Sequence, residues 1–248
     1  MTFNMTVSPD FTPDKISGWY IFNTWLQKRL GANIHLELFD GFESQRKAVD
    51  AGEIDIIYAN PFDAAWLVRE KNFLALARPC GVSDEAVVAV AEDHPAQAVE
   101  DLPEGVTVVS TDDPDIHLMG MIMLEPADLN QDNIHLSQVD NYVLVAKDLF
   151  RGNADVGFFL ESAYDNLSRM VKKRLRPLVR SQIGVIRHSM LIGPGLADRR
   201  DDLLEALTGM CEHPKGPGVL QSLGIQCWEE QTQEDTEFMI DLMDTLGA

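Results

Sequence analysis

Two residues with hydrogen-bonding side chains, Tyr58 and Asn60, lie in the stretch GEIDIIYANPFDAAWL, where an apolar strand gives way to a helix. Asn60 suits the helix N-cap and Pro61 the first helical turn. In parallel α/β sheets, ligands bind beyond the carboxyl ends of strands, where helix N-termini offer free N–H groups and a positive dipole end. Tyr58 and Asn60 are therefore candidate ligand residues, and simple capping and packing is the alternative.

A second strand-to-helix junction, VVSTDDPDIHLMG, carries two hydroxyl groups followed by two carboxylates. Hydroxyl groups suit the oxygens of a phosphate or a carboxylate, so we expect Ser110 and Thr111 to contact a ligand. Asp112 and Asp113 would weaken an anion site unless they point to solvent or hold a cationic part of the ligand. For these two aspartates we favour an ordinary structural role.

A third junction, DVGFFLESAYDN, places Glu161 at the start of a helix. A glutamate there complements the helix dipole or, as a ligand residue, binds an ammonium group. Two loops, FDGF and VDNY, contribute Phe42 to one half of the chain and Asp140 with Tyr142 to the other. These residues are candidates for the wall of a ligand pocket, and turn formation is the alternative.

Motifs for catalysis or metal binding are absent from the sequence. The six histidines form no HExxH or paired HxH pattern, and no GxSxG, GxxxxGK[ST] or GxGxxG motif occurs. The cysteines, Cys80, Cys211 and Cys227, lack CxxC spacing, so neither a zinc site nor a disulfide framework is predicted, although one pair can form. We predict no catalytic residue, no metal and no cofactor.

Composition excludes several classes of protein. The chain has 248 residues, and its net charge of −20 would repel nucleic acid and anionic lipid. No apolar run reaches the roughly 20 residues of a membrane span. The opening MTFNMTVSPD has no basic region followed by an apolar one, so no signal peptide is predicted there. We expect a periplasmic location if a leader was removed and a cytoplasmic one if Met1 is the natural start.

Short apolar runs alternate with amphipathic stretches, which indicates βα units with mainly parallel sheets. The stretch 13–30 has apolar residues at steps of three and four, which predicts a helix that Gly31 ends. The stretch after residue 193 is predicted to be largely helical. The apolar positions of the first helix are Ile16, Trp19, Phe22, Leu26 and Leu30.

A shift of 100 positions aligns NIHLELFDGFESQRKAVDAGEIDIIYAN with NIHLSQVDNYVLVAKDLFRGNADVGFFL without a gap. Gly52 and Asp55 recur as Gly152 and Asp155. This similarity indicates two α/β lobes of like build, joined by two hinge crossovers near positions 81 and 187. We place the first lobe at 1–82 and 188–248 and the second at 83–187.

The order of motifs resembles the phosphate/phosphite/phosphonate substrate-binding proteins of ABC transporters, a branch of the type 2 periplasmic binding proteins. The resemblance lies in VSPDFTP, WLQKRLG, GEIDIIYANPFDA, TVVSTDDPDIHLMGMIMLEP, VAKDLFRGNADVGFF and RHSMLIGPGLADRRDDLLEAL. It implies a monomeric two-lobed clamp that binds a small anionic organic ligand, such as a phosphonate, and hands it to an ABC permease. By resemblance, Ser8, Phe42, Tyr58, Ser110 and Thr111 are ligand residues.

Two departures from the family pattern concern the ligand. Asp112, Asp113 and Pro114 replace a Ser/Thr-Ser-Gly run, and Asp140 with Asn141 stands where many members carry a histidine. Both changes remove donors for an oxyanion. Two alternatives stay open: a cytoplasmic enzyme on the same fold, with Asp140 or Glu161 as general base, and a module that senses a ligand for a partner protein.

Overall fold

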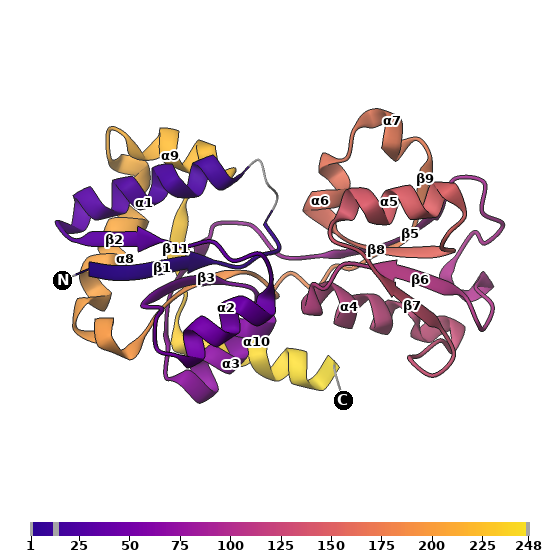
Figure 1. Ribbon diagram of the computed structural model, residues 1–248, viewed down its shortest axis with the longest axis horizontal. Helices are drawn as coiled ribbons and strands as arrows, with labels where there is room; N and C mark the ends of the chain where they lie inside the picture. The colour runs from indigo at the N-terminus through magenta and orange to yellow at the C-terminus, as the bar shows by residue number, and fades with distance from the viewer. Residues whose placement is uncertain (1, 12–14, 247–248) are drawn as a thin grey trace. The chain divides into compact units, whose positions relative to one another are not determined.

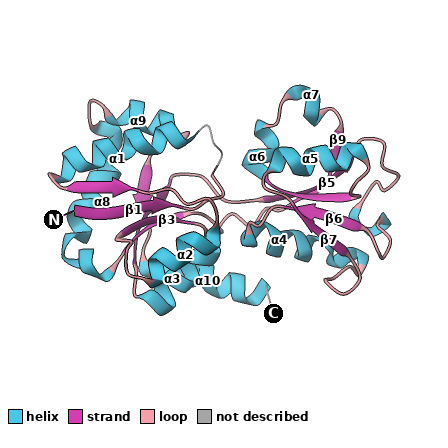
Figure 2. Ribbon diagram, viewed as in Figure 1, coloured by secondary structure: helices cyan, strands magenta, loops and turns pink. Residues whose placement is uncertain are grey.

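The computed structural model describes residues 2–11 and 15–246. The backbone divides into two compact units, one of residues 1–82 and 187–242 and the other of residues 83–186 and 243–248. Figure 2 shows that each unit has a β-sheet with helices on both faces. Each unit is an α/β sandwich with its own core.

The sheet of the first unit has the strand order β11-β4-β10-β3-β1-β2. Strand β1 pairs in parallel with β2 and with β3, whereas β10 pairs antiparallel with β3 and β4, and β11 antiparallel with β4. The bounds are β1 Thr2–Val7, β2 Asn33–Leu36, β3 Ile56–Ala59, β4 Leu74–Pro79, β10 Ser189–Ile192 and β11 Trp228–Glu230.

Helices cover both faces of this sheet. In Figure 1, α1 and α9 lie on one face and α2, α3 and α10 on the other. Helix α8 packs against α1. The bounds are α1 Ile16–Leu30, α2 Phe42–Asp50, α3 Pro61–Lys71, α8 Arg200–Thr208, α9 Gly216–Leu223 and α10 Gln233–Leu246, with short 3₁₀ turns at Pro194–Arg199 and Gly209–Glu212.

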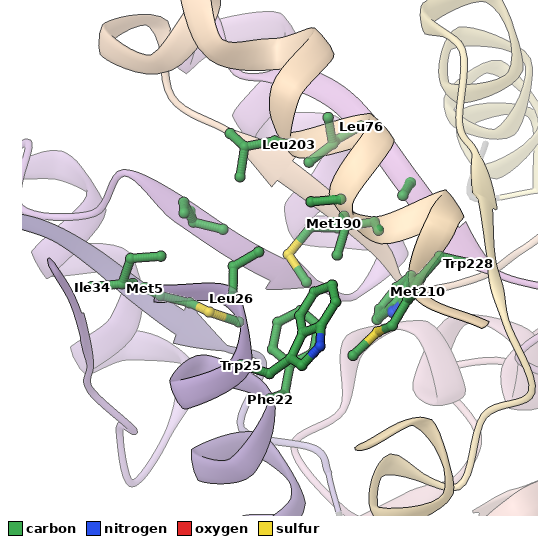
Figure 3. Packing of buried hydrophobic residues seen from close by; sticks show 14 of the residues in the cluster. Met5, Phe22, Trp25, Leu26, Ile34, Leu76, Met190, Leu203, Met210 and Trp228 are labelled. Atoms are coloured by element: carbon green, nitrogen blue, oxygen red, sulfur yellow. The ribbon is translucent and has the colours of Figure 1, made fainter. Parts of the chain in front are cut away.

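The apolar stripe of α1 forms the centre of the first core. Phe22 and Leu26 of α1 are fully buried among Met5 and Met190 of the sheet, with Trp228 closing the cluster (Figure 3). Each such side chain contributes roughly 1.5–3 kcal/mol through burial. The predicted helix is confirmed from Ile16 to Leu30, and Gly31 ends it with a left-handed φ of 61°; positions 13 and 14 lie outside the described residues.

The second unit has the strand order β7-β6-β8-β5-β9. Helix α4 packs on one face of this sheet and α5 and α6 on the other (Figure 1). The bounds are β5 Ala86–Ala91, β6 Thr107–Ser110, β7 His135–Gln138, β8 Val156–Leu160, β9 Leu175–Arg180, α4 Pro114–Leu124, α5 Tyr142–Arg151, α6 Glu161–Asn166 and α7 Arg169–Lys172, with 3₁₀ turns at Val99–Asp101 and Glu125–Ala127.

The sheets differ in one respect from the mainly parallel ones that we predicted, because each sheet is mixed. Strand β4 carries the chain out of the first unit and β10 brings it back, so the two run in opposite directions. For the same reason, β5 and β9 are antiparallel in the second unit. A further strand, β11, lies in the region that we predicted to be largely helical. This strand has only three residues, and its pairing with β4 stabilises it.

The repeat at a spacing of 100 positions has a structural basis. Gly52 and Gly152 follow α2 and α5 with left-handed φ angles of 71° and 72°. Asp55 Oδ2 then accepts a hydrogen bond from Asn4 N at 2.8 Å, and Asp155 Oδ2 accepts one from Thr107 N at 2.8 Å. Each aspartate joins the start of one strand to its parallel neighbour. The repeated residues therefore specify the same helix-to-strand turn twice.

One pair of cysteines is joined. Cys80 follows β4, Cys227 precedes β11, and a disulfide joins them with Cα atoms 5.4 Å apart. Cys211 is an exposed free thiol. The pairing that the sequence left open is thus formed between residues 147 positions apart. Separately, no helix of the described chain combines the length and apolar character required to cross a bilayer.

Candidate functional site

In the first unit, a buried polar cluster lies where the parallel strands β1 and β3 end. Asn60 caps α3 as predicted, because its Oδ1 accepts a hydrogen bond from Asp63 N at 2.7 Å. Its Nδ2 donates to Ser8 Oγ at 3.2 Å, and Ser8 N donates to the carbonyl of Tyr58 at 2.8 Å. The structure therefore brings together three predicted site residues, Ser8, Tyr58 and Asn60.

An ion pair supports this cluster from the helix side. Arg46 Nε donates to Asp63 Oδ1 at 2.6 Å, and Asn60 Nδ2 donates to Asp63 Oδ2 at 3.3 Å. Burial raises the pKa of Asp63, while the hydrogen bond and charge of Arg46 oppose this rise. The Arg46 guanidinium also lies 5.4 Å from the ring of Phe42, which is only 6% exposed. The buried ring of Phe42 offers little surface for contact, and its ligand role stays a prediction.

Tyr58 belongs to an aromatic group on the same sheet. Its half-buried ring is stacked on His188 with centroids 5.3 Å apart and contacts Trp19 at 4.9 Å. His188 Nε2 lies 2.9 Å from Asp10 Oδ2. The sequence analysis missed Asp10 and His188, because His188 is the residue immediately before β10, and only the pairing of β10 with β3 brings it beside Tyr58.

In the second unit, the predicted hydroxyl groups end β6. Ser110 is fully buried, and its Oγ has no hydrogen-bond partner among the described residues. Thr111 is 5% exposed, and its Oγ1 accepts a long hydrogen bond from Asp113 N at 3.5 Å. Buried hydroxyl groups are seldom left unpaired, so Ser110 holds an unused donor at a strand end.

Asp113 caps α4. Its Oδ1 accepts hydrogen bonds from Asp115 N at 3.1 Å and Ile116 N at 3.3 Å, and its Oδ2 accepts one from the hydroxyl of Tyr142 at 2.8 Å. The carboxylate is buried, which agrees with the structural role that we favoured, whereas Asp112 is exposed. Tyr142 is itself 8% exposed. Its predicted place in a pocket wall is untested.

Glu161 is held by an arginine that the sequence analysis did not select. Arg180 donates from Nη1 to Glu161 at 2.6 Å and from Nη2 to Asp165 at 3.1 Å. Burial by itself would lower the pKa of Arg180. The two hydrogen bonds outweigh that effect, so the pKa lies above its ordinary value. Arg180 is the last residue of β9, and the pairing of β9 with β5 places it beside the end of β8. Glu161 therefore already has an ion-pair partner within the chain.

A pocket of about 370 Å³ lies beside this ion pair, and it includes Glu85. Glu85 accepts hydrogen bonds from Ile183 N at 3.0 Å, from Gly184 N at 2.7 Å and from the hydroxyl of Ser181. Burial raises the pKa of Glu85, but these donors outweigh it and leave the pKa below its ordinary value. The remaining lining residues are Glu161, Arg180 and Gln182.

The last candidate, Asp140, is exposed in the loop before α5, where Asn141 Oδ1 caps the helix by accepting from Leu144 N at 3.1 Å. The ligand role of Asp140 stays a prediction. Among residues 2–11 and 15–246, no group of three histidine, cysteine or acidic side chains is placed to hold a metal ion.

Several solved binding proteins have a fold similar to that of this chain. PhnD1 of Prochlorococcus marinus, in complex with methylphosphonate, has a TM-score of 0.83 at 10% identity, with 99% of this chain and 98% of that chain covered. The binding-protein component of a phosphonate ABC transporter from Pseudomonas aeruginosa has a TM-score of 0.78 at 12% identity, with coverage of 100% and 89%.

The periplasmic aliphatic sulphonate-binding protein SsuA of Escherichia coli is also similar, with a TM-score of 0.66 at 15% identity and coverage of 98% and 91%. No curated protein sequence matched. These structures confirm the two-lobed α/β fold of the type 2 periplasmic binding proteins. A family model described as "ABC transporter, phosphonate, periplasmic substrate-binding protein" matches residues 5–236, so the chain belongs to this family.

Proposed function

We propose that this protein binds a small organic oxyanion of the phosphonate or sulfonate class and delivers it unchanged to the permease of an ABC importer. The family match over residues 5–236 supports the class of ligand. One feature of the geometry points to particular residues. In the first unit, Ser8 and Asn60 follow the neighbouring parallel strands β1 and β3. In the second unit, Ser110 and Thr111 lie at the end of the single strand β6. Such groups suit the oxygens of a small anion.

The proposed ligand residues of the first unit are Ser8, Tyr58 and Asn60, which are linked by hydrogen bonds. In the second unit they are Ser110 and Thr111. Because Ser110 and Thr111 are covered in this structure, contact with a ligand requires the groups over them to move. The further candidates Phe42, Asp140, Tyr142 and Glu161 belong to the proposal with less support. Phe42 is buried, Tyr142 is buried and bonded to Asp113, and Glu161 is bonded to Arg180.

We propose the family's setting for this chain as well: a monomer in the periplasm, without turnover of its ligand. The disulfide between Cys80 and Cys227 supports an oxidising compartment, since structural disulfides are rare in the cytosol. Recovery of the added ligand, chemically unchanged by NMR after prolonged incubation, would support binding without catalysis. A new product would favour the enzyme alternative.

Isothermal titration of methylphosphonate and methanesulfonate tests the proposal. We expect at least one of them to bind the wild-type protein and the Ser110→Ala variant to bind it about 10- to 100-fold more weakly, as for a lost hydrogen bond to a charged group. Ser110 Oγ has no partner among the described residues, so the substitution breaks no internal bond. Ser137→Ala, an exposed serine of β7, is the matched control. Failure of both anions to bind would refute the proposed function.

A further inference from the structure

A buried side-chain amide holds the end of strand β1 in the first unit. Gln45, on α2, is 1% exposed, and its Nε2 donates hydrogen bonds to the carbonyl of Val7 at 2.8 Å and to Thr6 Oγ1 at 3.1 Å. Thr6 is fully buried, and Val7 is the last residue of β1. The next residue is Ser8, one of the proposed ligand residues. Gln45 therefore binds the backbone immediately before a proposed ligand contact.

The internal repeat shows what these two positions need for packing. Strands β1 and β6 are equivalent, because each pairs in parallel, at the same register, with the strand that contains the repeated NIHL. In this register Thr6 corresponds to Val109, and a shift of 100 positions takes Gln45 to Val145 on α5. Both valines are fully buried, and α5 packs against β6. The second unit thus folds with two apolar side chains where the first unit has a hydrogen-bonded polar pair.

The two units also end these strands differently. In the second unit, Val139 N, directly after β7, donates to the carbonyl of Ser110 at 2.9 Å. In the first unit, β2 ends earlier in the repeat than β7 does, and the carbonyl of Val7, the equivalent of Ser110, accepts from Gln45. Buried carbonyl groups require a donor. The amide of Gln45 therefore does for the end of β1 what a backbone N–H does for the end of β6.

Ser8 is held from two further elements. Its N–H donates to the carbonyl of Tyr58, at the end of β3, at 2.8 Å. Its Oγ accepts from Asn60 Nδ2, at the start of α3, at 3.2 Å. A hydroxyl group that accepts a hydrogen bond can also donate one. Together with Gln45, these contacts fix both the backbone and the hydroxyl group of Ser8.

We propose that Gln45 is a positioning residue of the ligand site, whose amide fixes the end of β1 so that Ser8 can donate its hydroxyl proton to a bound oxyanion. The inference rests on the proposed function, in which Ser8 contacts the ligand. Burial of a primary amide costs free energy that its hydrogen bonds must offset. Valine serves for packing at the equivalent place in the second unit. Packing therefore does not explain Gln45, whereas a binding site needs donors that are held in one geometry.

The test is isothermal titration with methylphosphonate and methanesulfonate, well below the melting temperature, where a loss of stability alone leaves the affinity of the folded protein unchanged. Gln45→Met keeps the length of the side chain and removes its donors. We expect it to bind the preferred anion about tenfold more weakly than wild type. Gln221→Met, the same change at an exposed position of α9 in the same unit, should keep wild-type affinity.

A second variant copies the pair of the second unit. Thr6→Val combined with Gln45→Val has two buried apolar side chains, as at Val109 and Val145, and should also bind about tenfold more weakly. Wild-type affinity in either folded variant would overturn the inference. Failure of both variants to fold would overturn it as well, because Gln45 would then serve the fold rather than the site.

A double-mutant cycle with Ser8→Ala separates positioning from a general structural effect. If Gln45 acts through Ser8, Gln45→Met should change the affinity of the Ser8→Ala variant by less than about twofold. The same tenfold loss in both backgrounds would show that Gln45 acts independently of Ser8 and would refute the positioning role. Binding of neither anion by the wild-type protein would overturn the proposed function together with this inference, whereas the other contrary results overturn the inference alone.

Discussion

The disulfide between Cys80 and Cys227 makes a quantitative prediction, because it encloses an unusually long loop. The two cysteines are 147 positions apart, and residues 83–186 of the second unit lie between them. Replacement of both cysteines by alanine removes the cross-link. Both cysteines are only partly buried, so the substitution leaves no large cavity. Its main effect is on the entropy of the unfolded chain.

The loop length sets the size of the effect. A loop of 147 residues corresponds to about 5 kcal/mol at 25 °C in the chain-entropy model. If the second unit stays folded while the first unfolds, Asp84 N still donates to the carbonyl of Ile186 at 2.8 Å. That contact shortens the effective loop to roughly 45 residues and the contribution to about 4 kcal/mol. We therefore expect the double variant to lose about 4–5 kcal/mol of the free energy of unfolding of the first unit.

Tryptophan fluorescence during urea unfolding measures this loss in the correct unit. All four tryptophans, at positions 19, 25, 66 and 228, belong to the first unit. The matched control is Cys211→Ala, which removes the exposed free thiol and should change the free energy of unfolding by less than about 0.5 kcal/mol. Adding a reductant should destabilise the wild-type protein to the level of the double variant and leave the double variant unchanged.

Two results would refute this reasoning. One is a double variant that is no less stable than Cys211→Ala. The other is a wild-type protein whose urea midpoint does not respond to a reductant that has demonstrably opened the disulfide. A smaller loss of about 2 kcal/mol would agree with the lower range measured for native disulfides and would indicate residual structure in the unfolded chain.

Three further predictions concern single side chains. Gly120→Ala should destabilise the second unit by about 1–3 kcal/mol, because an added Cβ would lie 2.4 Å from the ring of Phe158. Gly218→Ala, with open space at its Cβ position, is the control in thermal unfolding, and equal melting temperatures would contradict the prediction. The lowered pKa of Glu85 contributes stability that is present above the ordinary glutamate pKa and is lost as the pH falls through the lowered value. Glu85→Gln should make stability depend less on pH in acid titrations followed by circular dichroism. An unchanged pH dependence would mean that other groups cause it. Asn60→Ala should cost about 1 kcal/mol as a lost N-cap, and it should also weaken ligand binding in isothermal titration, whereas a capping role alone would leave affinity unchanged.

Much of the local structure could be predicted from the sequence because it depends on residues within a few positions of one another. The apolar steps of α1, the pairing of Asn60 with Pro61 at the start of α3, and Gly31 at the end of α1 follow from helix geometry and caps. The order of such motifs along the chain also sufficed for the family and the two-lobed α/β fold, which the comparisons confirm.

The candidate site could be predicted only in part. The junctions at Ser110 and Asn60 carry local signals, whereas Arg180 gave none, because arginine is mostly a surface residue and its position in the sequence does not reveal a partner. Its partner Glu161 lies 19 positions away on another element. Which of the predicted residues contact a ligand stays a prediction that the proposed titrations address.

The sequence by itself thus determined most of the individual elements, caps such as Asn60, the repeated turn at Asp55 and Asp155, and the family. The tertiary structure alone decided the contacts between distant segments: the mixed pairing of the sheets, the disulfide across 147 positions, and the hydrogen bond from Tyr142 to Asp113. The physical reason is that a cap or a turn is satisfied by neighbours in the chain. A buried ion pair or a cross-link instead depends on which elements the fold places side by side.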